Sequence, residues 1–229
     1  RVLAQADCRT AKVKVAEPGE FSDEDIARVR AVAETLAELH GQRARVRVDA
    51  NAAWTVVEAA DLLTRLDQAA SSVGGLEYAE QPVATVGEMA ELKRLIPIPL
   101  AADESIRRAH NPHAVRQRRA ADVGVYKVAP LGGIAPARQL AAELGLPPVV
   151  SSALDSSIGI AAGVLLAASL PDLPYACGLN TVTMFAADVL ETPLTASEGS
   201  LDVGAAMAAR TAPLNPVAAA PKDATMDRW

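Results

Sequence analysis

The stretch Arg45-Val46-Arg47-Val48-Asp49-Ala50-Asn51 decides the fold class, because a short apolar run ends there in an acidic residue and a turn. Similar runs recur along the whole chain. As a set, the short runs of this kind are rich in Val, Leu and Ile and lack clean alternation, which is typical of parallel strands buried on both faces. The strand candidates are residues 11–15, 45–49, 76–80, 99–103, 123–127, 148–151 and 175–178.

Helical patterns separate these strand candidates. Ser22 is expected to cap a helix whose first turn is acidic, where negative charge meets the positive end of the helix dipole, and Gly41 ends that helix. Comparable patterns cover residues 56–68, 86–96, 134–144 and 158–170.

The repeated strand–helix order predicts an α/β fold with a parallel sheet, of the TIM-type (β/α) barrel kind. Seven candidates are one strand short of the usual eight, and residues 1–6 resemble the last turns of a helix. The first strand is therefore expected before residue 1. Residues 1–204 are predicted to form the barrel domain, and residues 205–229 a C-terminal tail without an assigned structure.

Composition narrows the classes of partner and the compartment. The net charge of −6 disfavours nucleic acid and anionic membranes, and the basic residues Arg116, Arg118 and Arg119 are interpreted as a solvated helix face. Two cysteines far apart, with no signal segment, predict a reducing cytoplasm. The apolar run at 158–170 is too short to cross a bilayer.

Five polar residues occupy the ends of five successive strand candidates: Lys14, Asp49, Glu80, Asp103 and Lys127. In a barrel, the carboxyl ends of the strands converge on one face, where reactive side chains gather. Each residue alone has an ordinary explanation, as a solvated lysine or as an acidic helix cap. The ordered set of five carries the functional hypothesis.

Three carboxylates on neighbouring strand ends would repel one another in a buried pocket, and a hard dication resolves that repulsion. Magnesium prefers oxygen ligands in octahedral geometry, and manganese accepts the same ligand type. Lys14 and Lys127 would face each other across the barrel mouth. The cation and a second ammonium favour the uncharged lysine that a general base needs, while the metal would polarise a substrate carboxylate.

The motif order resembles the muconate-lactonizing subgroup of the enolase superfamily: Lys-x-Lys at 12–14, Asp-Ala-Asn at 49–51, Glu-Gln-Pro at 80–82, Ala-Asp-Glu-Ser at 102–105, then Lys127. The resemblance covers about residues 1–204. It implies a magnesium site, formed by Asp49, Glu80 and Asp103. It also implies that Lys14 and Lys127 act on opposite sides of the substrate, with Lys12 as an electrostatic partner.

Within this subgroup, segments 151–159 and 177–181 look most like the o-succinylbenzoate synthase family of hydro-lyases, which makes the aromatic precursor of menaquinone from a cyclohexadiene carboxylate. The resemblance implies that Lys14 removes the proton alpha to the carboxylate, giving an enediolate intermediate. The same lysine then assists syn loss of the hydroxyl, while Lys127 stays charged. Asn51, Ser151 and Ser152 are candidates for substrate binding or electrostatic support; alternatively, the serines only cap the helix beginning near Ser157.

Two alternatives remain open at this stage. An N-acylamino acid racemase, such as one acting on N-succinylamino acids, would use the same two lysines. The second alternative is an inactive barrel fragment, because full-length relatives in this family carry an N-terminal α+β capping domain that helps to close the site. A dipeptide epimerase fits less well, because its Asp-x-Asp pattern is missing at Asn180. The sequence does not indicate the oligomeric state.

Overall fold

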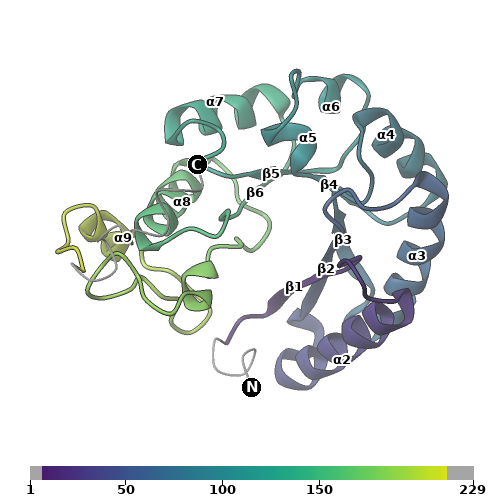
Figure 1. Ribbon diagram of the computed structural model, residues 1–229, viewed down its shortest axis with the longest axis horizontal. Coiled ribbons are helices and arrows are strands. Elements are labelled where there is room, and N and C mark those ends of the chain that lie inside the picture. The colour runs from purple at the N-terminus through teal and green to yellow at the C-terminus, as the bar shows by residue number, and fades with distance from the viewer. Residues whose placement is uncertain (1–6, 216–229) are drawn as a thin grey trace.

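The computed structural model describes residues 7–215 of the chain. In this part of the chain, six parallel strands form one sheet in the order β1-β2-β3-β4-β5-β6, so that neighbours in sequence are neighbours in space. The strands are β1 (Thr10–Lys14), β2 (Arg45–Asp49), β3 (Leu76–Glu80), β4 (Leu100–Ala102), β5 (Val123–Tyr126) and β6 (Pro148–Val150). They lie along an arc in Figure 1. The predicted α/β class is confirmed.

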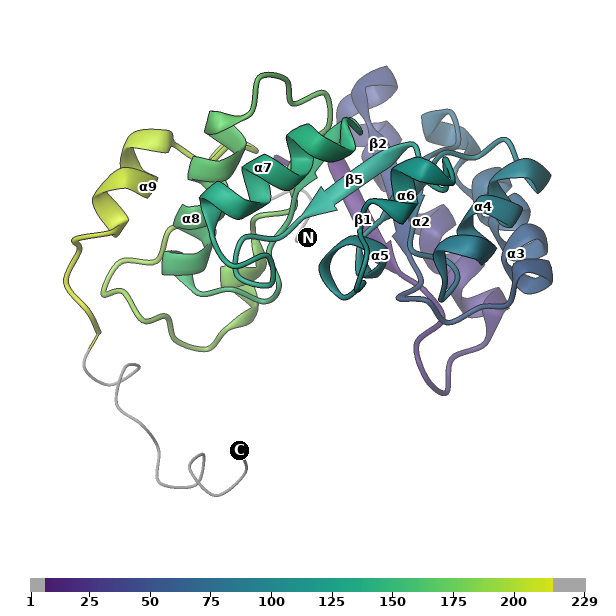
Figure 2. The same cartoon turned by 90° about the horizontal axis from the view of Figure 1, so that it is seen from above.

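Helices line the outer side of the arc (Figures 1 and 2). The longer ones are α2 (Ser22–His40), α3 (Val56–Ala69), α4 (Val86–Leu95), α7 (Ile134–Leu144) and α8 (Ser157–Ser169). The shorter ones are α5 (Glu104–Arg107), α6 (Ala114–Gln117) and α9 (Val203–Ala209), with 3-10 turns η1 (Gly41–Arg43), η2 (Ser71–Val73) and η3 (Thr181–Met184).

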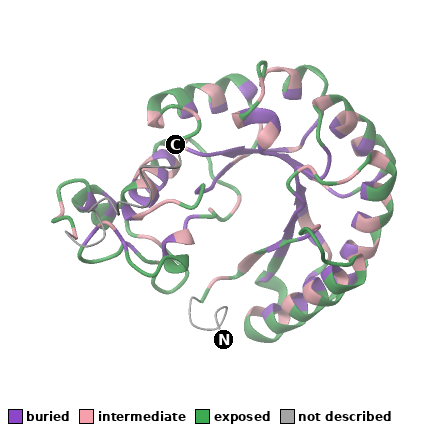
Figure 3. Cartoon of the chain, in the orientation of Figure 1, coloured by how far each residue is buried: buried purple, intermediate pink, exposed green. Residues whose placement is uncertain are grey.

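Two apolar layers hold the sheet in place. The larger layer packs the inner faces of the helices against the outer face of the sheet, with Leu36, Leu63 and Leu92 fully buried. A smaller cluster inside the arc contains Tyr78 and Val125. Figure 3 shows β2 to β6 largely buried, β1 mostly intermediate or exposed, and the outward faces of the helices exposed. The sheet is therefore covered on both faces from β2 onward, as the apolar strand pattern predicts.

The start of α2 differs from the prediction. Ser22 is the first residue of the helix, and the N-cap position belongs to Phe21. The carboxylate of Glu24 instead accepts a hydrogen bond from the Phe21 backbone N–H at 2.9 Å. The prediction that Ser22 caps the helix is wrong, because the N-cap position lies one residue earlier, at Phe21, and Ser22 already belongs to the helix.

The predicted strand at 175–178 is also wrong as an extended strand. In the described residues, this segment forms only a single parallel bridge, between Gly178 and Ser151. The carbonyl of Ala176 accepts a hydrogen bond from the Arg47 side chain rather than from a strand neighbour. The sheet is thus a curled half-barrel, with β1 and β6 at its two ends.

The C-terminal part continues beyond the sheet. Helix α9 packs against α8 and buries Ala206 and Ala209, so the predicted domain boundary after residue 204 falls inside α9. The predictions for residues 1–6 and for the end of the tail, 216–229, lie outside the described residues. Between residues 7 and 215, no helix has the length and apolar character needed to span a lipid bilayer.

Candidate active site

The five candidate residues lie at one edge of the sheet. Lys14, Asp49 and Glu80 are the last residues of β1, β2 and β3, while Asp103 and Lys127 directly follow β4 and β5. The parallel register pairs Lys14 with Asp49, and Asp49 with Glu80. Because all strands run in the same direction, these side chains gather at the carboxyl edge of the half-barrel.

Lys12 connects the first two carboxylates. Its Nζ lies 2.8 Å from Asp49 Oδ2 and 2.8 Å from both carboxylate oxygens of Glu80. Residues 12 and 14 share one face of β1, because side chains alternate along a strand. Asp49 and Glu80 therefore already converge on one shared cationic centre, the Lys12 ammonium.

Lys14 lies at the more open side of this group. Its Nζ donates to Asp49 Oδ2 at 2.6 Å and to Asn51 Oδ1 at 2.6 Å. Nearly half of the Lys14 side chain is exposed (47%), whereas Asp49 is buried. The Lys14 amine is thus both fixed in direction and accessible from outside the cluster.

A second ion-pair group surrounds Asp103. Lys127 Nζ donates to Asp103 Oδ2 at 2.6 Å, and Arg107 Nε donates to Asp103 Oδ1 at 2.8 Å. Arg107 also donates to Glu104 Oε1 at 2.5 Å, and Asn51 donates to the same oxygen at 3.3 Å. Asn51 therefore links the Lys14 side of the site to the Asp103 side.

Burial and charge act in opposite directions on the carboxylates. Burial raises the pKa of Glu80 above its ordinary value; Lys12 opposes this, and the charges of Asp49 and Asp103 add to it. For Asp49, burial also acts to raise the pKa, but Lys12 and Lys14 outweigh it and the pKa falls below its usual value. The effect of Asp49 and Asp103 on Glu80 shows that the three carboxylates influence one another.

The turns after β2 and β3 are held in unusual backbone conformations. Asn51, Ala52 and Gln81 have positive φ angles of 46°, 65° and 36°. Such strain in residues other than glycine persists only where the surroundings enforce it, and it concentrates at functional sites. Here it aims Asn51 into the lysine–carboxylate cluster.

Gln81 is the buried anchor of the next turn. Its Oε1 accepts hydrogen bonds from the backbone N–H groups of Asp103 and Ser105, at 3.2 and 3.0 Å. Its Nε2 donates to Val83 O and to Ser105 Oγ, each at 2.9 Å. One side chain thereby fixes where Asp103 leaves β4.

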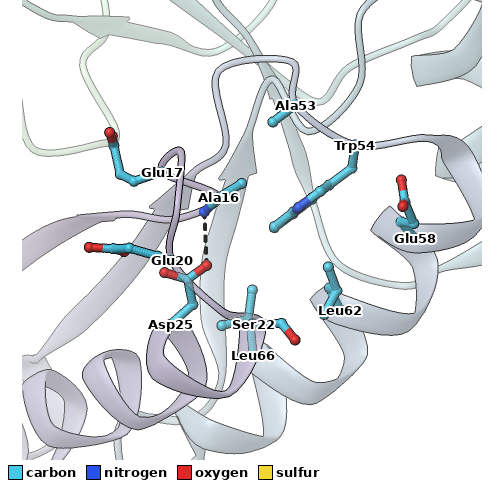
Figure 4. Close-up of a pocket in the computed structure, with 10 residues that line it drawn as sticks. All are labelled: Ala16, Glu17, Glu20, Ser22, Asp25, Ala53, Trp54, Glu58, Leu62 and Leu66. Atoms are coloured by element: carbon cyan, nitrogen blue, oxygen red, sulfur yellow. Dashed lines mark hydrogen bonds between the residues drawn. The ribbon is translucent and has the colours of Figure 1, made fainter.

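The end of β1 is held from α2. Arg28 donates to the Lys14 carbonyl at 2.9 Å, and Asp25 accepts from the Ala16 N–H at 2.8 Å. Figure 4 shows this Asp25–Ala16 bond at the edge of a pocket that Trp54 also lines. These contacts fix the backbone on both sides of Val15 and so orient Lys14.

Ser151 and Ser152 lie after β6 at the same edge of the sheet. Ser152 Oγ donates to Gly178 O at 3.0 Å and accepts from Thr181 Oγ1 at 2.8 Å. Helix α8 begins at Ser157, as the alternative interpretation expects, but Asp188 Oδ1 accepts the Ser157 N–H at 2.9 Å. The serine pair is thus bound to the 178–181 segment, and its role towards a substrate stays a prediction.

Sequence reasoning missed Arg107 and Gln81. Arg107 follows Asp103 by four residues, a spacing that favours an ion pair on a helix and would have identified it. Gln81 had no such signal, because its partners Asp103 and Ser105 belong to another strand end. Its place in the Glu-Gln-Pro motif alone does not reveal the contact.

The donor set has the chemistry that a hard dication requires: three buried carboxylates, at 0%, 1% and 0% exposure for Asp49, Glu80 and Asp103. Two of them already share one cation, the Lys12 ammonium. Among residues 7–215, no three acidic, histidine or cysteine side chains are gathered closely enough to hold a metal as they stand. The residues fit a divalent cation by donor type, burial and charge, and the ligand set itself stays a prediction.

This fold and this site define a class: a (β/α) half-barrel with an acidic cluster flanked by lysines at its carboxyl edge. The chain belongs to the family described as "Enolase C-terminal domain-like", which matches residues 1–207.

Relatives with known names agree with this assignment. The o-succinylbenzoate synthase of Thermobifida fusca (strain YX) is 53% identical over 203 residues, which are 89% of this chain and 61% of that protein. The chain thus spans about three fifths of the length of this curated relative.

Solved structures share the fold. A muconate cycloisomerase from Pseudomonas fluorescens is similar with a TM-score of 0.75 and 26% identity, covering 88% of this chain and 54% of that one. An enolase from Thermobispora bispora DSM 43833, complexed with magnesium and formate, has a TM-score of 0.71 and 25% identity, covering 88% and 46%.

Proposed function

We propose that the protein containing this chain is an o-succinylbenzoate synthase, a hydro-lyase of menaquinone biosynthesis that removes water from a hydroxylated cyclohexadiene carboxylate. The observation that carries the proposal is the accessible Lys14 amine, held at 2.6 Å by buried Asp49 beside a cluster of carboxylates. The relative of that name, at 53% identity across most of the chain, supports the choice of reaction.

The charges of the site favour a small carboxylate as substrate. Four acidic side chains (Asp49, Glu80, Asp103, Glu104) meet four basic ones (Lys12, Lys14, Arg107, Lys127), so the cluster is close to neutral as it stands. A bound dication would make it positive. An anionic substrate is then attracted even though the whole chain carries a charge of −6.

Lys14 acts as base and then as acid. In its uncharged form, Nζ accepts the proton alpha to the substrate carboxylate, and the electron pair of that C–H bond moves toward the carboxylate. Nζ then returns a proton to the departing hydroxyl on the same face, which leaves as water. Asp49 and Asn51 hold the amine in one direction for both transfers.

Lys127 stays protonated throughout. Only 9% of its side chain is exposed, and Asp103 fixes its ammonium at 2.6 Å. A buried, oriented cation stabilises negative charge that develops on the substrate, because little water screens it. Lys12, whose side chain is 27% exposed, adds a positive charge beside Asp49 and Glu80.

We propose that Asp49, Glu80 and Asp103 hold a divalent cation, Mg²⁺ or Mn²⁺. When bound, that cation would polarise the substrate carboxylate and stabilise the charge formed on proton loss. The enolase of Thermobispora bispora complexed with magnesium supports this choice of ion. We also propose a cytoplasmic location, on the grounds of cysteine usage given above.

The test is a product assay on the full-length protein with Mg²⁺. The cyclohexadiene carboxylate and a set of N-succinylamino acids are supplied in parallel; the aromatic product is followed by ultraviolet absorbance, and racemisation by optical rotation and by NMR of alpha-proton exchange in D₂O. Formation of the aromatic product supports the proposal. Racemisation of the amino acids without any aromatic product would overturn it in favour of the racemase, and loss of both activities would favour an inactive barrel.

A further inference from the structure

A buried arginine inside the arc has no part in the chemistry described above. Arg47 lies on β2, two residues before Asp49, and only 3% of its surface is exposed. Its guanidinium lies 4.6 Å from the ring centre of Tyr78 and 5.8 Å from that of Tyr175. The two rings meet edge to face at 5.9 Å.

This guanidinium connects opposite sides of the half-barrel. Nε donates to Glu77 Oε2 at 2.5 Å, next to its own strand. Nη1 donates to Ala176 O at 2.8 Å, on a segment 129 residues further along the chain. Arg47 is therefore a direct link between β2, which carries Asp49, and the segment that replaces the expected seventh strand.

Burying a cation in the protein interior is energetically unfavourable compared with burying an apolar side chain. Transfer of a charged group out of water costs free energy unless partners satisfy it, and an apolar side chain of similar volume is often at least as stabilising. Here the partners are incomplete, because Arg47 Nη2 has no hydrogen-bond partner among the described residues. Packing alone does not explain an arginine at this position.

The contacts beyond Ala176 lead to the serine pair. Two residues later, the Gly178 N–H donates to Val150 O at 2.9 Å, and Gly178 O accepts from both the backbone N–H and the Oγ of Ser152, at 2.9 and 3.0 Å. Thr181, three residues after Gly178 at the start of η3, donates to Ser152 Oγ at 2.8 Å. The position of Ser152 thus depends on the segment that Arg47 holds.

We propose that Arg47 is a positioning residue: it holds the 175–178 segment and, through Gly178, fixes Ser152, which we propose as a contact of the substrate carboxylate. This proposal rests on the proposed function for its substrate. Within residues 7–215, the segment pairs with a strand neighbour only at the Ser151–Gly178 bridge, and Arg47 adds a restraint two residues earlier, at Ala176.

The experiment compares Arg47→Met with Arg45→Met in the full-length protein. Arg45 lies on the same strand, but its guanidinium donates only to the nearby carbonyls of Gln42 and Ala44, which makes it a matched control. Amide hydrogen exchange needs no substrate and tests the restraint directly. Faster exchange at residues 150–153 and 175–181 in Arg47→Met, with Arg45→Met unchanged, is the expected result; unchanged exchange in Arg47→Met overturns the proposal.

Kinetics then separate positioning from a general defect. Arg47→Met is expected to raise KM about tenfold, the effect of losing one hydrogen bond at a binding group, with kcat within about twofold. A variant that merely folds poorly would instead lower kcat at unchanged KM, because fewer molecules are active. That pattern would overturn the proposal.

A double variant completes the test. Ser152→Ala should raise KM by itself. Adding Arg47→Met should raise KM little further, because both changes disrupt the same contact between Ser152 and the substrate. Arg47→Lys, which keeps the charge but lacks the planar guanidinium that reaches Glu77 and Ala176 together, should give an intermediate KM. Fully additive effects of the two changes on KM would contradict the proposal. If the wild-type protein has no dehydratase activity, the proposed function is wrong, and the hydrogen-exchange result alone decides on the role of Arg47.

Discussion

Lys127 and Asp103 form an almost completely buried ion pair, with 2.6 Å between Nζ and Oδ2 and side-chain exposures of 9% and 0%. Asp103 is shared with Arg107, so it keeps one cationic partner if Lys127 is removed. The pair joins the end of β4 to the end of β5 and fixes the Lys127 ammonium at the carboxyl edge of the sheet. Its removal therefore tests the role of Lys127 without leaving a carboxylate unpaired.

We expect Lys127→Ala to lower kcat for dehydration at least about 100-fold, because the variant loses a preorganised charge at the reacting centre. The measurement is the rate of aromatic product formation, together with deuterium exchange at the alpha carbon of both enantiomers of an N-succinylamino acid. Equal loss in all assays agrees with a charge-stabilising role. Loss of exchange in one enantiomer only would show that Lys127 is a second base, as in a racemase.

Lys93→Ala is the matched control for the lysine variants. Lys93 lies on α4 and pairs with Asp122, with both side chains partly exposed, outside the candidate site. Exposed pairs of this kind contribute about 0–1 kcal/mol to stability. The Lys93→Ala variant should therefore have the same activity as the wild type.

Metal dependence is expected to reside in the carboxylates. Chelation of divalent cations should abolish activity, and Mg²⁺ should restore it. At a Mg²⁺ concentration of 100 times Kd, the free energy of unfolding should rise by about 2.7 kcal/mol. Asp49→Asn and Glu80→Gln should lose this stabilisation in a calorimetric scan, whereas Asp61→Asn, on the exposed face of α3, should keep it. If Mg²⁺ stabilised the wild type and all three variants equally, Asp49 and Glu80 would be ruled out as ligands.

Gln81 should matter for stability more than its position in a loop suggests. Gln81→Met would leave the backbone N–H groups of Asp103 and Ser105 buried without an acceptor. At about 1–3 kcal/mol for each of the two unsatisfied groups, the free energy of unfolding should fall by about 2–6 kcal/mol. Gln139→Met, where the amide contacts only Glu143 on the surface, should change it by less than about 0.5 kcal/mol. Unfolding in denaturant measures the stability of both variants. Similar unfolding midpoints for Gln81→Met and Gln139→Met would contradict the stabilising role of Gln81.

Asp188 should make the start of α8 sensitive to acid. Burial acts to raise its pKa, but hydrogen bonds from Ser157 and nearby backbone N–H groups outweigh this, so the pKa of Asp188 is lowered. A lowered pKa in the folded state gives stability that is present above the unfolded value of about 3.9 and lost as the pH falls through the folded value.

Asp188→Asn should therefore lower stability at pH 7 by about 1 kcal/mol, as for the loss of a helix cap, and should flatten the decline below about pH 4. Unfolding in denaturant across pH 2 to 7 measures this, with Asp172→Asn, at an exposed position after α8, as the control. An acid profile of Asp188→Asn that matches the wild type would contradict it.

The ends of β2 and β3 were predictable from the sequence because each of these runs stops at an acidic residue. The runs ending at Asp49 and Glu80 match β2 and β3 in both bounds. The Lys-x-Lys spacing also predicts that both lysines face the same side of β1, and both contact Asp49 in the structure. Local patterns therefore suffice where a feature depends on strand alternation.

Features that depend on a distant partner were not predictable. The run at 175–178 has the composition of a strand, but within the described part of the chain a single bridge forms, between Gly178 and Ser151. The link from Arg47 to Ala176 joins residues 129 positions apart. Neither hydropathy nor residue spacing contains that information, since it arises from the curvature of the sheet.

The central claim is that Lys14 removes the proton beside the substrate carboxylate. The most direct measurement is solvent-deuterium incorporation at that carbon, in the full-length Lys14→Ala variant with Mg²⁺, beside wild type and Lys93→Ala. We expect no exchange and no aromatic product from Lys14→Ala, with both present in the two controls. Exchange at the wild-type rate in Lys14→Ala would contradict the account, because the proton would then have another acceptor.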